Sequence, residues 1–337
     1  MRAMEAKTDG ARDRVGAATK TREFAFLLLD RFTMFAFAAA LEPLRVANRM
    51  AERPLYSWKL VAEDGASATC SNGARVMVDI GLADLDRDAM VIVCGGLDVK
   101  RTTTKPVVTW LRKQERRGVG MGAVCTGAWA LAKAGLLDEA RCTIHWENRE
   151  GFREEFPDIA LSDRYYERDG RRWTASGGAA PADMMLAMIA EDGGRELAAE
   201  VMDQLAMTPL RAQADRQRLS APARMGVRHP KLTSVIRRME DAIEEPVSPS
   251  LLAEEVGLST RQLERLFRRY LDRSPKRYYM ELRLERARAL LLQTDMSVIN
   301  VALACGFTSP SHFSKCYRAH YGRTPYRERG VVEGAGA

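Results

Sequence analysis

A helix–glycine–helix pattern occurs twice near the end of this 337-residue chain and constrains its fold more than any other feature. The first copy runs from Leu252 to Tyr270 with Gly257 at its turn, and the second runs from Val301 to Arg318 with Gly306 at its turn. In each copy a short apolar helix is followed by glycine, an apolar residue, a Ser or Thr cap and a second helix rich in basic and polar residues. This is the layout of a helix-turn-helix unit, so the pair predicts DNA binding.

The segment between the two units predicts one long helix from Lys276 to Leu292. Its apolar residues recur at helical spacing, and they are Leu284, Ala287, Leu290 and Leu291. Such a helix would hold the two units at a fixed distance. Two helix-turn-helix units held on one rigid helix are suited to bind two neighbouring major-groove segments on one face of the duplex, roughly one turn apart.

The polar faces of the second helix in each unit supply the predicted DNA contacts. The predicted set is Arg261, Gln262, Glu264, Arg265, Arg268 and Arg269 in the first unit, and Ser311, His312, Lys315 and Arg318 in the second. Outward residues early in a recognition helix reach base edges, and flanking basic residues hold phosphates. We therefore expect base contacts from Arg261 and Arg265, and phosphate contacts from Arg268, Arg269 and Arg318. His312 is either a base contact or an exposed histidine without a role.

Charge and length support two domains. The formal net charge is +7, and 18 Lys and Arg against 12 Asp and Glu lie between Lys231 and Arg329. Most of the basic excess is therefore at the predicted DNA-binding end, as expected of a polyanion-binding module joined to a near-neutral one. We predict a disordered tail at 1–21, a sensor and dimerisation domain at 22–205, a basic linker at 206–229, a DNA-binding domain at 230–329 and a tail at 330–337.

The N-terminal half alternates short apolar runs with helical patterns. Phe24–Leu29, Ala89–Cys94 and Val119–Val124 read as buried strands, while Met34–Met50 and Lys105–Arg116 read as helices. Tyr56–Glu63 and Ala74–Ile80 read as further strands, Ala128–Ala134 and Pro181–Ala190 as helices, and the residues around Asp169-Gly170 as a hairpin. Alternation of this kind predicts an α/β fold with a doubly wound, mostly parallel sheet, followed by an all-α domain with two helix-turn-helix units.

The sequence Gly122-Ala123-Val124-Cys125-Thr126-Gly127 lies at a strand-to-helix junction and has the form of a nucleophile elbow. Such a turn exposes a side chain above the sheet, where backbone N–H groups and a helix N-terminus would lower a thiol pKa. Gly95-Gly96 ends another strand and could offer N–H groups to an oxyanion or a ligand carboxylate. His145 and Glu42 are further candidates for this site.

These motifs resemble known families. The second helix-turn-helix unit, with Ala302, Gly306, Phe307, Phe313 and Pro325, resembles the AraC/XylS transcription regulators. The cysteine elbow with His145 and Glu42 resembles the flavodoxin-like PfpI fold, which is similar to class I glutamine amidotransferases. The pairing of the two resembles the GlxA family of regulators over about residues 22–329.

The resemblance implies a homodimeric activator that binds double-stranded promoter DNA and RNA polymerase. It also implies a small effector that is amino-acid-like or a quaternary ammonium compound. The predicted ligand-binding residues are Glu42, Gly95, Gly96, Cys125, Thr126, Trp129, His145 and Trp146. Either tryptophan could pack on a cationic group or could belong to the core.

Three alternatives to a ligand pocket remain open at Cys125. It could be the nucleophile of an amidase or hydrolase with His145 as base and Glu42 nearby, or a redox-sensing thiol, or part of a domain that serves only dimerisation. The fusion to a DNA-binding unit favours sensing, so we expect a regulator rather than an enzyme.

Composition sets the remaining expectations. The six cysteines form no CxxC pair and no Cys/His cluster at zinc spacing, so we predict reduced thiols, no metal and no cofactor. The first twenty or so residues lack the apolar region of a signal peptide. The apolar stretch from Phe24 to Leu41 is interrupted by Asp30-Arg31, which makes it a poor membrane span. We therefore expect a cytoplasmic protein without membrane contact.

Overall fold

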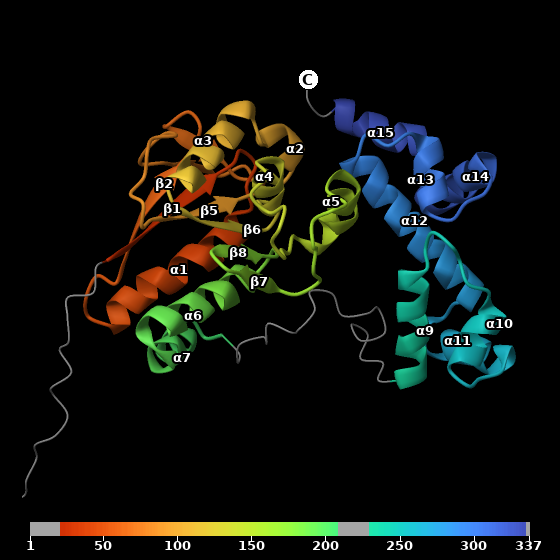
Figure 1. Ribbon diagram of the computed structural model, residues 1–337. Coiled ribbons are helices and arrows are strands. Elements are labelled where there is room, and N and C mark those ends of the chain that lie inside the picture. Colours follow the sequence, from red (N-terminus) through yellow and green to blue (C-terminus); the bar gives the residue numbers. More distant parts are fainter. Residues whose placement is uncertain (1–20, 208–228, 335–337) are drawn as a thin grey trace, which may run out of the picture.

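The computed structural model describes residues 21–207 and 229–334, which form an α/β half and a helical half (Figure 1). The predicted N-terminal tail lies outside the described residues except for Thr21. Most of the predicted linker at 206–229 also lies outside them.

The central sheet has the strand order β2-β1-β5-β6-β8-β7. The strands are β1 (Arg22–Leu28), β2 (Tyr56–Val61), β5 (Met90–Cys94), β6 (Gly120–Val124), β7 (Tyr166–Asp169) and β8 (Arg172–Ala175). All neighbours pair in parallel except β7 with β8, which form the predicted hairpin. The prediction of a doubly wound, mostly parallel sheet is confirmed. The sequence reading missed β3 (Ser67–Thr69), which pairs antiparallel with β4 (Arg75–Met77) in a small separate sheet.

Helices cover both faces of the sheet (Figure 1). One face is covered by α1 (Met34–Met50), α6 (Ala180–Gly193) and α7 (Arg195–Gln204), and the other by α2 (Val99–Thr102), α3 (Lys105–Arg116) and α4 (Ala128–Lys133). Successive residues of β1 alternate between the two cores: Phe24 and Phe26 pack in the first, Ala25 and Leu27 in the second. Every second residue of a strand shares a face, so a strand buried on both sides reads as a continuous apolar run.

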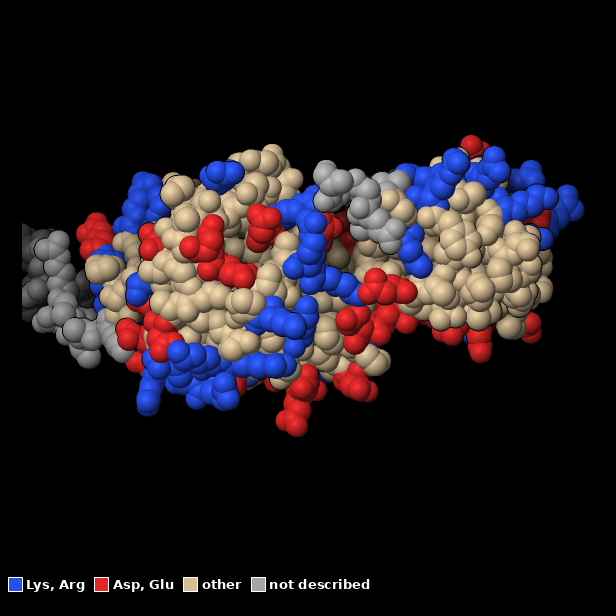
Figure 2. Space-filling model, turned by 90° about the horizontal axis from the view of Figure 1, so that it is seen from above, with Lys and Arg blue, Asp and Glu red and all other residues tan. Residues whose placement is uncertain are grey.

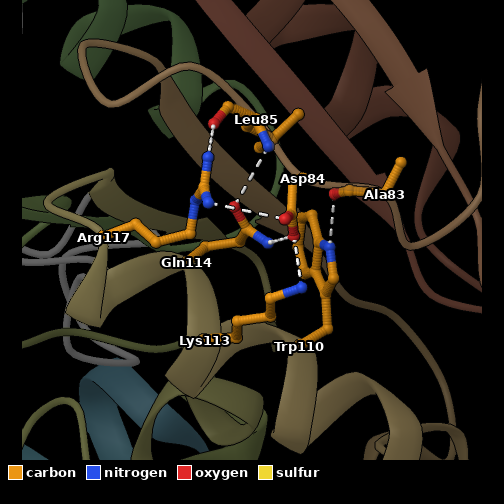
Figure 3. A network of polar contacts seen from close by, with 7 residues as sticks. All are labelled: Ala83, Asp84, Leu85, Trp110, Lys113, Gln114 and Arg117. Carbon is orange, nitrogen blue, oxygen red and sulfur yellow. Dashed lines mark hydrogen bonds and ion pairs between the residues drawn. The ribbon is translucent and has the colours of Figure 1, made fainter.

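Polar contacts from α3 fix the loop that leads into β5 (Figure 3). The Trp110 indole donates to the Ala83 carbonyl at 2.7 Å, and the buried Gln114 amide oxygen accepts from Leu85 N–H at 3.2 Å. Lys113 pairs with Asp84 at 2.7 Å, and Arg117 pairs with the same carboxylate at 3.4 Å. These contacts hold the loop against the helix at the edge of the sheet opposite to Cys125, which follows β6.

The C-terminal half is entirely helical. It consists of α9 (Pro230–Asp241), α10 (Pro249–Glu255), α11 (Thr260–Leu271), α12 (Pro275–Gln293), α13 (Val298–Ala304), α14 (Pro310–Tyr321) and α15 (Pro325–Gly334). Serine side chains accept an N–H in the first turn of α10 to α14, and these caps are Ser248, Ser259, Ser274, Ser297 and Ser309. The prediction of a tail from Gly330 was wrong at its start, since α15 continues to Gly334.

Helix α12 joins the two helix-turn-helix units, as the sequence predicts. Near its start, Tyr278 and Tyr279 pack with the first unit around Phe267. Further along, Leu284 and Leu291 pack with the second unit. Each unit therefore packs its core against a different part of α12, and this fixes the two units relative to each other.

Candidate nucleic-acid interface and ligand site

Helix α11 presents a polar face to solvent in the first unit. Leu263 and Phe267 are fully buried, and the side chains predicted to face DNA are all exposed: Arg261, Gln262, Glu264, Arg265, Arg268 and Arg269. Gln262 also completes a capping box, because its amide oxygen accepts the Ser259 N–H at 2.8 Å. This bond ties Gln262 to the start of its helix.

Helix α14 does the same in the second unit. Phe313 and Tyr317 are fully buried, while Ser311, His312, Lys315 and Arg318 are exposed. The turn before α14 is held by Arg283, which sequence reasoning did not single out. Its guanidinium donates to the carbonyls of Cys305 and Gly306 at 2.8 and 2.7 Å and lies 4.1 Å from the centroid of the Phe307 ring.

Basic side chains gather along one margin of the helical half in the view of Figure 2, and acidic side chains lie mostly toward the opposite margin. Segregation of charge at this end of the molecule is the footprint expected of a polyanion-binding surface. The mixed charges over the α/β half show no comparable segregation in this view.

Cys125 occupies the predicted elbow between β6 and α4. Its backbone φ is +58°, a left-handed conformation that non-glycine residues adopt infrequently. The Cys125 N–H donates to the Ser176 carbonyl at 3.2 Å, and its carbonyl accepts the His145 N–H at 3.0 Å. The sulfur lies 3.5 Å from the hydroxyl oxygen of Thr33, which immediately precedes α1. Loops after β1, β6 and β8 therefore meet at this cysteine.

The thiol environment does not activate a nucleophile. Burial raises the pKa of Cys125, and this effect outweighs the hydrogen bonds with the Thr33 hydroxyl and the Thr126 N–H, which act in the opposite direction. Burial also lowers the pKa of His145, which favours a neutral imidazole. Among the hydrogen bonds of the described residues, none joins the His145 ring to the Cys125 sulfur. The expectation of a lowered thiol pKa at the elbow was wrong, because desolvation of the sulfur dominates.

The carboxylate near His145 is Glu147, which sequence reasoning missed. Its Oε2 lies 3.8 Å from the His145 Nδ1. Glu42, the predicted carboxylate, instead pairs with Arg45 at 2.6 Å within α1. Glu42 lies eight residues after Met34, the first residue of α1. It is therefore about 12 Å along the helix from the end next to Thr33, which contacts Cys125. Glu147 lies two positions after His145 in the sequence, and this closeness is the one signal that could have suggested that it is the carboxylate near the imidazole.

Glycines let the loops around Cys125 approach closely. A Cβ on Gly96 would collide with the Arg31 carbonyl, and one on Gly177 would collide with the His145 ring. The Thr126 hydroxyl donates to the Gly96 carbonyl at 2.8 Å, which ties the β5 loop to the elbow. The Gly95 N–H donates to the Val124 carbonyl at 3.3 Å, so it is already engaged within the fold.

The two tryptophans have different environments. Trp129 is 2% exposed and packs edge-on against Phe152 and Phe156 in the core, so it belongs to the core rather than to the site. Trp146 is 37% exposed and lies with its ring centroid 5.6 Å from that of His145. It is thus the tryptophan that a ligand beside His145 could reach.

A separate pocket of about 840 Å³ lies at the same edge of the sheet, beyond β1 and β2. Its lining includes Asp30, Glu63, Asp64, Arg75 and Arg101. Sequence reasoning did not identify it, because its walls come from five separate segments. Its acidic groups already serve the fold: Glu63 accepts the Thr104 hydroxyl at 2.6 Å, and Asp64 accepts two backbone N–H groups.

Comparison with known proteins identifies both halves. Residues 33–191 match the DJ-1/PfpI family, and residues 252–330 match a helix-turn-helix domain. The HTH-type transcriptional regulator GbdR of Pseudomonas aeruginosa is 46% identical over 308 residues, which cover 91% of this chain and 84% of that protein. The regulator GlxA of Rhizobium meliloti is 39% identical and covers 90% of this chain and 94% of its own. The chain belongs to the GlxA-type family of transcriptional regulators.

A solved structure is similar to just over half of the chain. The crystal structure of an AraC family transcriptional regulator from Pseudomonas putida is 25% identical, with a TM-score of 0.50. It covers 55% of this chain and 99% of that chain. The recognition of a PfpI-type domain followed by an AraC-type domain is therefore confirmed, and with it the prediction of a DNA-binding regulator rather than an enzyme. Within the described residues, no helix has the length and apolarity needed to cross a bilayer.

Proposed function

We propose that this GlxA-type regulator reads promoter DNA with α11 and α14 and that a small effector bound at the Cys125 edge controls the response. The observation that carries the first part is the pair of serine-capped recognition helices with exposed polar faces, fixed on α12. The sensor would span residues 22–205 and the DNA-binding domain residues 230–329. As a DNA-bound regulator, the protein would act in the cytoplasm, as a homodimer that contacts RNA polymerase as an activator.

For DNA contact, we assign base recognition to Arg261 and Arg265 in the first unit. In the second unit we assign it to Ser311, His312 and Lys315. Support comes from their exposure on the outward faces of the two helices. Arg268, Arg269 and Arg318 would hold phosphates. Glu264 would face the groove beside Arg265, and Gln262 would act chiefly through its capping bond.

The test of DNA recognition starts with an operator selected from a random DNA pool by the full chain. Arg265→Ala should lower operator affinity by about 1–3 kcal/mol and relax base preference at one position. Arg87→Ala, which removes an exposed arginine from the sensor half, is the charge-matched control and should leave affinity unchanged. Equal weakening by Arg265→Ala on every sequence would show that the residue contacts phosphate instead.

For the effector, we propose a small molecule that carries a carboxylate and a cationic nitrogen, of the amino-acid-like or quaternary ammonium class. Trp146 supports a cationic group because its ring is exposed beside the neutral His145, and cations pack on tryptophan faces. The carboxylate would lie against the loops at Gly96 and Cys125–Thr126, which the Thr126 hydroxyl ties together just before α4.

Thermal unfolding of the full chain tests this assignment with three probes: glycine betaine, acetate and tetramethylammonium. A ligand at one hundred times its Kd stabilises the folded state by about 2.7 kcal/mol, so glycine betaine should raise the Tm by several degrees. Acetate and tetramethylammonium, which each carry one of the two groups, should do less. Trp146→Ala should abolish the shift, whereas Tyr326→Ala, a matched exposed aromatic on α15, should not. Retention of the shift in Trp146→Ala would move the ligand elsewhere, with the 840 Å³ pocket as the first alternative.

A further inference from the structure

Two short elements of the α/β half lie against the long helix of the DNA-binding half. They are the 3-10 helix η1 (Trp146–Asn148) and α5 (Arg149–Glu155), and both contact α12 (Figure 1). The Gln293 side-chain amide at the end of α12 donates to the Glu147 carbonyl at 2.6 Å. Arg286, further back on α12, pairs with Glu150 at 3.1 Å, and both side chains are about three-quarters buried.

The fit between the two surfaces is close and is complementary in charge. A Cβ added at Gly151 would lie 3.0 Å from both the Cβ and the Oε1 of Gln293, so a larger residue would have to push Gln293 aside by a few tenths of an ångström. Lys100 of α2 pairs with Glu155 at 2.8 Å and approaches Asp295, just beyond α12, at 3.7 Å. Each half thus contributes a basic group that faces an acidic group of the other half.

η1 and α2, which carries Lys100, both follow loops that meet at Cys125. η1 begins immediately after His145, whose N–H donates to the Cys125 carbonyl. Lys100 follows the Gly95-Gly96 loop, which the Thr126 hydroxyl ties to the elbow. On the other side, α12 ends at Gln293 and α13 begins at Val298. The second helix-turn-helix unit is therefore linked to the Cys125 loops through two short stretches of chain.

We propose that η1 and α5 form a docking surface for α12, and that this interface transmits changes at the Cys125–His145 edge to the second helix-turn-helix unit. The inference rests on the proposed function, since it names the route by which that ligand site would control DNA binding. A ligand can shift such an equilibrium only by binding the docked and undocked arrangements with different affinity. A polar interface suits reversible docking, because interfaces between domains of one chain resemble transient ones.

The first experiment measures docking in the full chain without ligand, by small-angle scattering. Arg286→Glu and Glu150→Arg each place like charges across the interface, so each should increase the radius of gyration. The double variant, Arg286→Glu with Glu150→Arg, restores the pair with reversed sign and should return the radius toward that of the unmodified protein. Glu139→Arg, at an exposed turn of the sensor half, is the matched control and should have no effect. An unchanged radius in both single variants would overturn the docking surface.

The second experiment measures transmission by the rate at which iodoacetamide alkylates Cys125, followed by mass spectrometry of the peptides. Release of α12 should loosen η1 and the His145 N–H bond to Cys125. Because a buried thiol is alkylated only when its loops open, Glu150→Arg should raise the alkylation rate, by about fivefold for a coupling free energy at the low end of the usual range. Cys70, buried beside the small β3–β4 sheet of the same half, is the internal control and should keep its rate.

The outcomes of the two experiments distinguish a failure of the docking proposal from a failure of the proposed function. If the single variants expand the protein but leave Cys125 alkylation unchanged, transmission is refuted while operator binding and ligand binding stand. If glycine betaine and operator DNA both fail to bind but the charge swap restores docking and alkylation, the proposed function fails and the interface stands.

Discussion

At the residue scale, Cys125 combines the backbone geometry of a nucleophile elbow with surroundings that disfavour the reactive thiolate. Its φ of +58° and its position between β6 and α4 are those of a nucleophile elbow. Its sulfur is nevertheless buried, and burial penalises the thiolate more than two hydrogen bonds favour it. The elbow therefore brings three loops to one point in surroundings that disfavour the thiolate, which suits a site that binds rather than reacts.

The raised pKa of Cys125 predicts how alkylation of the folded protein depends on pH. Only the thiolate reacts, and an ordinary cysteine becomes half ionised near pH 8.5. For Cys125 the rate should still be climbing above that pH, because its folded-state pKa is raised. The denatured chain should show the ordinary midpoint. A plateau near pH 8.5 in the folded protein would contradict the desolvated environment.

At the element scale, the two helix-turn-helix units use the same turn with different packing. Gly257 and Gly306 both have a left-handed backbone, with φ of +62° and +73°. A Cβ at Gly257 would meet nothing closer than the Lys231 Nζ at 3.8 Å. A Cβ at Gly306 would lie 2.6 Å from the Ile243 carbonyl oxygen and 2.7 Å from the Pro246 Cγ. The second turn is therefore enclosed by the rest of the domain, and the first is open.

This difference predicts unequal costs for the same substitution. Gly257→Ala should destabilise the folded state by about 1–2 kcal/mol, the cost of a left-handed L-residue. Gly306→Ala should add an overpacking cost of about 1–3 kcal/mol. Urea unfolding of each variant beside the unmodified protein measures both values. Equal decreases in the free energy of unfolding would show that residues 243–246 move aside without an energetic penalty.

At the scale of the whole molecule, α12 sets the distance between the two helix-turn-helix units. Its 19 residues span about 28 Å at 1.5 Å per residue, close to one turn of B-DNA at about 34 Å. Because each unit shares a core with this helix, neither can turn independently. The sensor half contacts the same helix through η1 and α5, so sensing and reading meet on one element.

Hydroxyl-radical footprinting tests this spacing. Each protomer should protect two short segments on one face of the duplex, centred about 10 base pairs apart. Lys315→Ala should weaken protection of one segment, and Arg265→Ala should weaken the other. Protection on opposite faces would mean that α12 bends or that only one unit enters the groove.

The sequence predicted most of the elements but fewer of the contacts between them. Met34–Met50 and Lys105–Arg116 have the bounds that the structure gives to α1 and α3, because helical periodicity and capping are local properties. β3, η1 and α5 were missed, since they are short and lack a strong period. At the site, Cys125 and His145 do lie together, whereas Glu42 and Trp129 lie elsewhere.

The sequence by itself determined the two helix-turn-helix units and the cysteine elbow, because each depends on residues close together in the chain. It also determined the parallel sheet, because strands that alternate with helices and are buried on both faces leave continuous apolar runs. Tertiary structure alone decided which carboxylate lies near His145, that Trp129 belongs to the core, and that burial raises the pKa of the Cys125 thiol. It also decided that α5 docks on α12. These outcomes depend on burial and on contacts between segments far apart in sequence, which no local pattern encodes.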